Sequence, residues 1–228
     1  MDSNSKNILF IITSVVKVKD NYVSAFTTDE RYKQTLNTIH SIRSRLPYAQ
    51  IVVVEASHTN TPIVFDGVIM YYVDNTILGD SKSIGEAIIL QTFISSSLYE
   101  SLTCERNHLV FKISGRYFLD DNFDITKFDE NKMNCRLIDT KNDPNDTHYN
   151  VNYISANPDI CSVTSFFAFP SNITEYFHGR MLFVIDSIVR FGSDIEHHIF
   201  RNVPDEMINN IDLIGISGFI TSGRFLTY

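Results

Sequence analysis

Short, continuous runs of apolar residues alternate with longer amphipathic stretches through the first half of the chain. Each run is bounded by polar or turn residues, and the four runs are residues 7–12, 51–54, 68–73 and 109–113. Such a run is typical of a strand that is buried on both faces of a parallel sheet. The intervening stretches have apolar residues at helical spacing. The pattern therefore predicts alternating strands and helices.

Two helix starts are predicted from capping-box signatures. Thr27 and Glu30 open a stretch that carries apolar residues at helical spacing and ends at Pro47. Ser83 and Glu86 have the same spacing and predict a second helix that extends through Leu98. In this signature the two side chains satisfy each other's free backbone N–H groups.

The second half of the chain has a more mixed pattern. Shorter strands are expected at residues 135–139, 149–154 and 160–169, and two or three helices between residues 173 and 202. A last strand is expected at residues 211–216. Together the two halves predict an α/β fold with a mostly parallel central sheet flanked by helices. We expect one domain over residues 1–228, with a larger half at about 7–125 and a smaller mixed lobe at about 126–228.

Composition narrows the class of function. The 228 residues have a formal net charge of −8, and Lys and Arg are scattered along the chain. Nucleic-acid binding needs a clustered basic face, so it is not expected. Three cysteines without a Cys-x-x-Cys spacing favour a reducing compartment. The N-terminus has no signal-peptide pattern, and no apolar stretch reaches membrane-spanning length. We therefore expect an intracellular, soluble protein without a membrane span.

Polar residues follow all four predicted strands of the first half. The carboxyl ends of parallel strands share one sheet edge, where open α/β sheets bind their ligands. The residues expected there are Thr13, Ser14, Glu55, Asp74, Ser114, Gly115 and Arg116. The glycine would let the backbone approach a phosphate, and the guanidinium would neutralise it. The alternatives are ordinary turn chemistry at Thr13 and Ser14 and a solvated strand end at Glu55.

Several well-known catalytic motifs are missing. The first strand is not followed by Gly-x-Gly-x-x-Gly, and the chain has no Walker A loop. Hydride transfer and P-loop phosphoryl transfer are therefore disfavoured. The chain also lacks Gly-x-Ser-x-Gly and His-Glu-x-x-His, so the hydrolase and metalloprotease templates do not fit.

Three further groups of residues could take part in chemistry. Lys82 lies at a predicted helix N-terminus, where free N–H groups attract anions, although the spacing alone favours a plain capped helix with an exposed lysine. Asp194 and Glu196 lie beside His197 and His198 and could supply a general base. A capping box between Ser193 and Glu196 is the alternative. Asp120, Asp121 and Asp124 could hold a divalent cation or be solvated turn acids.

In element order, the chain resembles small sugar-nucleotide-dependent glycosyltransferases of the GT-A fold. It is similar in particular to the virus-encoded type, represented by the N-terminal domain of the chlorella-virus capsid glycosyltransferase. The segments that carry the resemblance are residues 10–15, 30–36, 53–55, 82–86, 111–117 and 193–197.

The resemblance implies a nucleotide-binding first half and an acceptor-side second half. It implies that Thr13, Ser14, Val15 and Glu55 bind the nucleoside and that Lys82, Gly85, Ser114, Gly115 and Arg116 bind the diphosphate. The family usually carries Asp-x-Asp with Mn²⁺ or Mg²⁺ at the end of the fourth strand, where this chain has Ser114, Gly115 and Arg116. Either Arg116 replaces part of the cation's charge, or Asp120 and Asp121 provide the metal site from a shifted position.

The expected function is sugar transfer from a nucleoside-diphosphate sugar, with UDP-sugar favoured, to a glycan or glycoprotein acceptor. Asp194 and Glu196 are the expected catalytic residues, near the acceptor or the anomeric carbon. A viral origin would place the protein in the host cytoplasm. The alternatives are a non-catalytic sugar- or nucleotide-binding module of the same fold and a Mg²⁺-dependent nucleotidyltransferase. The sequence does not indicate the sugar, the stereochemical outcome or the oligomeric state.

Overall fold

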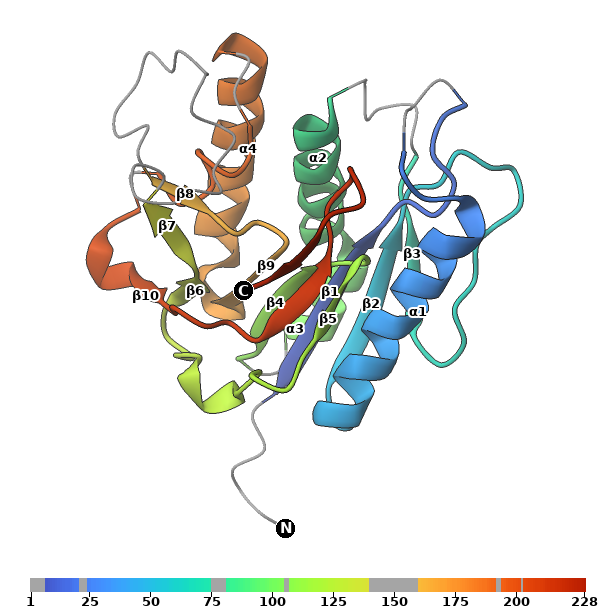
Figure 1. The fold of residues 1–228 in the computed structure, drawn as a ribbon. Helices are drawn as coiled ribbons and strands as arrows, with labels where there is room; N and C mark the ends of the chain where they lie inside the picture. The colour runs from blue at the N-terminus through green and yellow to red at the C-terminus, as the bar shows by residue number, and fades with distance from the viewer. Residues whose placement is uncertain are drawn as a thin grey trace.

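A computed structural model describes residues 7–20, 24–74, 81–104, 107–139, 160–191, 194–201 and 203–228. Its centre is a seven-stranded sheet with the order β10-β6-β9-β4-β1-β2-β3 (Figure 1). The strands are β1 (Ile8–Ser14), β2 (Gln50–Glu55), β3 (Ile69–Tyr72), β4 (Leu109–Ser114), β6 (Met133–Cys135), β9 (Phe166–Pro170) and β10 (Ile208–Asn210). Only β9 runs antiparallel to its neighbours, so the sheet is mostly parallel, as predicted.

Helices and a second sheet cover the two faces. The helices are α1 (Thr28–Arg45), α2 (Lys82–Ile94), α3 (Ser97–Thr103) and α4 (Thr174–Phe191). The small strands are β5 (Tyr117–Leu119), β11 (Ile216–Phe219) and β12 (Phe225–Thr227) in one antiparallel sheet, and β7 (Leu137–Asp139) with β8 (Ile160–Ser162) in another. Among the described residues, no helix is long and apolar enough to cross a membrane.

The alternation of side chains along the central strands divides the core into two layers. Leu9 and Ile11 pack toward α2, α3 and α4 on one face. Phe10 and Ile12 pack toward α1, β5 and β11 on the other. Both layers consist mainly of apolar side chains with little or no exposure, which is the main source of the stability of such a fold.

The first capping box is confirmed. The Thr27 hydroxyl accepts a hydrogen bond from the Glu30 backbone N–H, and the Glu30 carboxylate accepts one from the Thr27 N–H at 2.8 Å. The second capping box is wrong. Ser81 caps α2 by accepting from Ile84, and Glu86 makes an ion pair with Lys112 instead.

Other boundaries also differ from the prediction. The helix expected through Leu98 divides at Ser95 and Ser96, because Ser96 caps α3 and its hydroxyl also bonds to the carbonyl of Phe93. The strands expected at 135–139 and 160–169 each divide into two, giving β6 with β7 and β8 with β9. The strand expected at 149–154 lies outside the described residues.

The C-terminal elements differ most. The described part of 173–202 contains one α-helix, α4, and residues 194–201 form turns and bends. Ser193, the expected cap, lies outside the described residues. The strand expected at 211–216 begins only at Ile216, after Gly215. Gly215 has a φ of +83°, and a Cβ there would lie 2.2 Å from the backbone nitrogen of Phe123, so only glycine fits this contact.

Candidate functional site

The carboxyl ends of β1, β2 and β4 meet at one edge of the sheet, as predicted. Thr13 is in register with Ser114, and Ser14 is in register with Glu55. Chain order reverses here, because β2 lies on one side of β1 and β4 on the other. Open α/β sheets bind ligands at such a switch point. Glu55 and Ser114 are on strands two spacings apart, about 10 Å.

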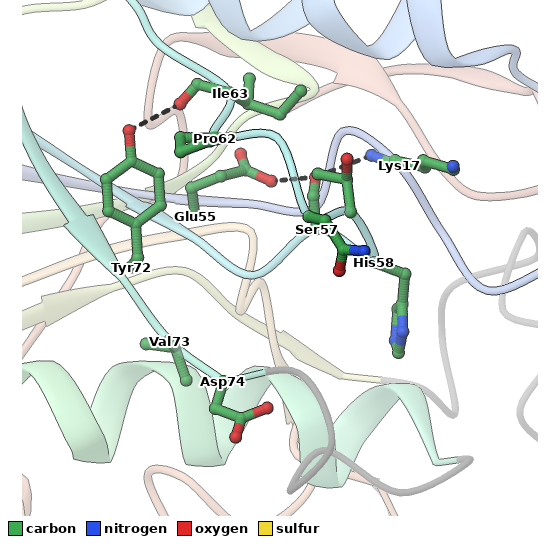
Figure 2. Close-up of a pocket in the computed structure, with 11 residues that line it drawn as sticks. Lys17, Glu55, Ser57, His58, Pro62, Ile63, Tyr72, Val73 and Asp74 are labelled. Atoms are coloured by element: carbon green, nitrogen blue, oxygen red, sulfur yellow. Dashed lines mark hydrogen bonds between the residues drawn. The ribbon is translucent and has the colours of Figure 1, made fainter.

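A pocket of about 610 Å³ opens at the ends of β2 and β3 (Figure 2). Its lining is mostly polar and includes Lys17, Glu55, Ser57, His58, Tyr72 and Asp74. A pocket of this volume is within the usual range for small-molecule sites. Of the residues expected at this sheet edge, Glu55 and Asp74 line it.

Glu55 is held rigidly at the base of this pocket. Its Oε1 accepts hydrogen bonds from the backbone N–H of Val16, at 3.0 Å, and from the hydroxyl of Ser57. The Ser57 hydroxyl oxygen in turn accepts from the backbone N–H of Lys17 at 2.8 Å. Among the described residues, the other carboxylate oxygen, Oε2, is buried and has no hydrogen-bond partner. Unsatisfied buried polar atoms are uncommon, so this oxygen marks an acceptor at the pocket that no described residue fills.

The pocket also contains residues that the sequence reasoning missed. Lys17 and His58 are joined through their backbones at 2.8 Å, which ties the loop after β1 to the loop after β2. Burial lowers the pKa of His58, and nearby Lys19 adds to this, while Asp20 and Asp74 oppose it. The polar segment after β2 was the available signal, because such loops at strand ends line ligand sites.

On the other side of β1 lies the Lys112 network, which consists of Glu86, Lys112, Ser114, Thr164 and Glu196. Lys112 is 1% exposed, and its ammonium donates to Glu86, to the Ser114 hydroxyl at 2.9 Å and to the Thr164 carbonyl at 2.7 Å. The Thr164 hydroxyl donates to Glu196 Oε1 at 2.9 Å. The network joins β4, α2 and the turns after β8 and α4.

The two carboxyl groups of the network have opposite pKa shifts. Burial raises the pKa of Glu86, but Lys112, Lys82 and two hydrogen bonds outweigh it and lower the value to about 2. Burial raises the pKa of Glu196, and the negative charges of Asp194 and Glu86 raise it further against the opposing effect of Lys82. Such a divergent pair is characteristic of acid–base sites.

Asp194, the other predicted catalytic residue, binds His197 rather than the network. Its Oδ1 lies 2.6 Å from His197 Nδ1 and 3.1 Å from the His197 backbone nitrogen. Its negative charge still raises the pKa of Glu196. His198 is buried, and burial lowers its pKa.

Most predicted phosphate-binding residues lie at or near this edge. Lys82 is exposed in the first turn of α2, and its charge acts on Glu86 and Glu196. Arg116 follows β4 directly, is partly exposed, and donates to the Thr221 hydroxyl at 3.0 Å between β11 and β12. Arg116 does not line the described pocket.

Thr13, Ser14, Val15, Gly85 and Gly115 contribute mainly backbone and packing. The Thr13 carbonyl accepts from Gly115, the Ser14 hydroxyl bonds to Thr35 at 3.2 Å, and the Val15 carbonyl accepts from Arg31. Gly85 is buried in α2. A Cβ on Gly115 would lie 2.7 Å from the Thr35 hydroxyl oxygen. Close packing against α1 therefore explains the glycine at position 115 without a phosphate.

The predicted metal ligands lie elsewhere. Asp121 pairs at 2.7 Å with Arg45, at the end of α1 and hence at the opposite edge of the sheet. Asp120 accepts hydrogen bonds from Asn122 and Ser217. At the end of β4, the hydroxyl of Ser114 is engaged by Lys112 and Glu86. Within the described ranges no group of three or more metal-binding side chains occurs. Asp120 and Asp121 thus have partners within the fold, and the expected Mn²⁺ or Mg²⁺ requirement stays a prediction.

Comparison with known proteins identifies no family. No family model matches the sequence, and no curated protein matches it. Among solved structures, the chain is similar to a glycosyltransferase involved in the glycosylation of the major capsid of PBCV-1, with a TM-score of 0.44 and 8% identity. That similarity covers 89% of this chain and 82% of the other. A likeness this distant does not assign the chain to a family.

Proposed function

We propose that this protein is a GT-A-like glycosyltransferase that moves a sugar from a nucleoside-diphosphate sugar, with UDP-sugar favoured, to a glycan or glycoprotein acceptor. The observation that carries the proposal is the pairing of two sites at one switch point. One is the Glu55 pocket, and the other is the carboxyl pair Glu86 and Glu196 beyond β1.

The chemistry of sugar transfer accounts for both sites. The free Oε2 of Glu55 accepts a hydrogen bond from a ribose hydroxyl or a base N–H. Arg116 and Lys82 meet the charge that develops on the diphosphate leaving group. Glu196 takes the proton of the acceptor hydroxyl, a role that its raised pKa favours because a base works best when its pKa is closer to the operating pH. Asp194 supports this role through its charge.

The directions of the side chains at the strand ends limit how the sugar-nucleotide donor can bind. By strand alternation Ser114 and Lys112 point to the face covered by α2 and α4, whereas Glu55 belongs to the opposite set. A donor that reaches both sites must therefore lie across the edge of the sheet. We assign the phosphates of the donor to Arg116, and its position in the turn that follows β4 at this edge supports this assignment.

A second candidate is a non-catalytic nucleotide-binding module. The observation in its favour is that Lys112 neutralises Glu86 and engages Ser114 at the strand end where the family carries metal ligands. Such a module would bind the donor and release no sugar. We find no comparable observation in the described residues that favours a Mg²⁺-dependent nucleotidyltransferase.

The test is a thermal-shift panel of UDP, GDP, CMP and S-adenosylmethionine, with and without Mn²⁺, followed by a donor-hydrolysis assay. A ligand at 100 times its Kd stabilises the fold by about 2.7 kcal/mol. For a chain of this length that corresponds to a rise in Tm of about 5–10 °C. We expect UDP to give this rise and UDP-sugar to be hydrolysed slowly. UDP binding without hydrolysis supports the module, and no response to UDP refutes the proposal.

Two variants locate the ligand. Glu55→Gln keeps an oxygen for Val16 and Ser57 but converts the free acceptor into a donor, so it should lose the UDP shift and keep its Tm. Arg116→Ala should also abolish the shift without unfolding the protein. Arg45→Ala removes an arginine at the opposite edge and serves as the control. An unchanged shift in Arg116→Ala removes this residue from the phosphate site.

A further inference from the structure

The turn that carries Glu196 is fixed to the core by a chain of polar contacts. The backbone carbonyl of Glu196 accepts two hydrogen bonds, one from the N–H and one from the hydroxyl of Ser162, each at 2.9 Å. Its carboxyl group accepts from the Thr164 hydroxyl at 2.9 Å. Since residues 194–201 contain no helix or strand of their own, these contacts determine where the carboxyl group lies.

Thr164 is itself held by Lys112. Its backbone carbonyl accepts from the Lys112 ammonium at 2.7 Å, and its side chain is almost completely buried. Lys112 is anchored in the centre of the sheet on β4, between β1 and β9. Glu86 on α2 neutralises the ammonium, which could not otherwise be buried at low cost.

We propose that Thr164, which Lys112 holds through its carbonyl, is a positioning residue that fixes the carboxyl group of Glu196 at the carboxyl edge of the sheet. The use of Glu196 as a base rests on the proposed function, whereas its positioning does not. A buried ammonium has three N–H donors to satisfy, and Lys112 directs one of them to the carbonyl of Thr164. The hydroxyl of the same residue donates to the Glu196 carboxyl group, so one residue joins the two.

The charged and titratable groups around Glu196 come from several elements. They are Asp194 on the same turn, Lys82 and Glu86 on α2, Lys112 on β4, Tyr117 on β5 and Tyr228 after β12. Changes at Thr164 and at Glu86 should therefore move the pKa of Glu196 in opposite directions. The Thr164 hydroxyl stabilises the charged carboxylate, whereas the charge of Glu86 opposes it.

The experiment is a ¹³C NMR titration of glutamate side-chain carboxyl carbons, with Glu196 assigned by its loss in Glu196→Gln. In Thr164→Val we expect the pKa of Glu196 to rise by about one unit, the equivalent of one hydrogen bond to a charged group. Thr164→Ser keeps the hydroxyl and should restore the wild-type value. In Glu86→Gln the pKa should fall, because a negative neighbour is lost and Lys112 keeps the Ser114 hydroxyl and the Thr164 carbonyl as acceptors. Both variants leave Lys112 in place.

Thr174→Val is the matched control, because it also removes a hydroxyl bonded within the fold, there to Tyr99 at 2.8 Å. It should leave the pKa of Glu196 unchanged. An unmoved pKa in Thr164→Val, or shifts of the same sign in Thr164→Val and Glu86→Gln, would overturn the proposal.

The pH profile of donor hydrolysis separates this inference from the proposed function. If Glu196 is the base, the acid limb should follow the NMR values, up in Thr164→Val and down in Glu86→Gln. If the NMR shifts appear but no protein hydrolyses UDP-sugar, the positioning is supported and the proposed function fails.

Discussion

Removing the charge of Lys112 should change how the free energy of unfolding depends on pH. In Lys112→Met the Glu86 carboxyl remains buried, with 15% of its side chain exposed, and has no cationic partner in contact. Breaking a buried ion pair by deleting one member costs about 3–5 kcal/mol. We therefore expect the free energy of unfolding at pH 7 to fall by that amount.

The pKa of Glu86 gives an independent magnitude. It lies at about 2 in the folded protein, against an ordinary value of 4.5. The difference of about 2.5 units corresponds to roughly 3 kcal/mol at 1.36 kcal/mol per unit. Because the folded pKa is depressed, this stabilisation is present above pH 4.5 and is lost as the pH falls toward 2. About 2 kcal/mol of it should be lost between pH 7 and pH 3.

Lys112 itself offsets part of this gain. Burial lowers its pKa, although Glu86 and Glu196 act in the opposite direction. The net contribution of the pair is therefore smaller than the figure for Glu86 alone. The pair's share of the loss of stability between pH 5 and pH 2 still comes from protonation of Glu86, because Glu86 is the member of the pair that gains a proton there.

Urea denaturation at pH 7, 5, 4 and 3 measures the effect. Wild type and Lys112→Met should differ by about 3–5 kcal/mol at pH 7, and the difference should shrink by at least about 2 kcal/mol at pH 3. Lys132→Met, at a partly exposed position outside the Lys112 network, is the control and should keep the wild-type pH dependence. A difference that stays constant from pH 7 to pH 3 would refute the assignment of the acid limb to Glu86.

Two further predictions test the packing. Gly115→Ala places a Cβ 2.7 Å from the Thr35 hydroxyl oxygen and should cost about 1–3 kcal/mol by urea denaturation. Adding Thr35→Ala should recover part of that loss of stability. Gly179→Ala on α4 is the control and should cost no stability, because a Cβ there meets nothing within 4 Å. Equal losses at positions 115 and 179 would contradict the packing explanation. With Ellman's reagent we expect one fast-reacting thiol, Cys104, which is exposed, and slow reaction at Cys135, where burial raises the pKa to about 12. Cys104→Ser should remove the fast phase, and a fast phase that persists would show that a buried thiol is accessible.

Local signals in the sequence determined much of the first half of the fold. The apolar runs at β1, β2 and β4 can be buried on both faces only within a sheet that is covered on both sides, whereas β3, at the edge of the sheet, is only partly buried. Thr27 and Glu30 lie three residues apart, so their capping box depends on no distant contact. The meeting of the strand ends at one edge followed from parallel pairing alone.

The capping box expected at Ser83 and Glu86 shows where local reasoning stops. The spacing was right, but a buried ammonium on β4 gives the Glu86 carboxylate a stronger partner than a backbone N–H. Lys112 was counted as part of an apolar strand, and its burial could not be read from neighbours in the chain. Its partners Glu86 and Thr164 are 26 and 52 residues away in sequence.

Some features of the candidate site likewise follow from local sequence, and others only from the tertiary structure. The sequence alone determined which polar residues stand at strand ends, and therefore that Glu55 and Arg116 share an edge. Only the tertiary structure decided that Glu55 keeps one carboxylate oxygen without a partner, that Asp121 lies at the far edge beside Arg45, and that Glu196 joins Lys112 through Thr164. The physical reason is that strand and cap signals act over a few residues, whereas the burial and pairing of charges depend on which distant segments the fold brings together.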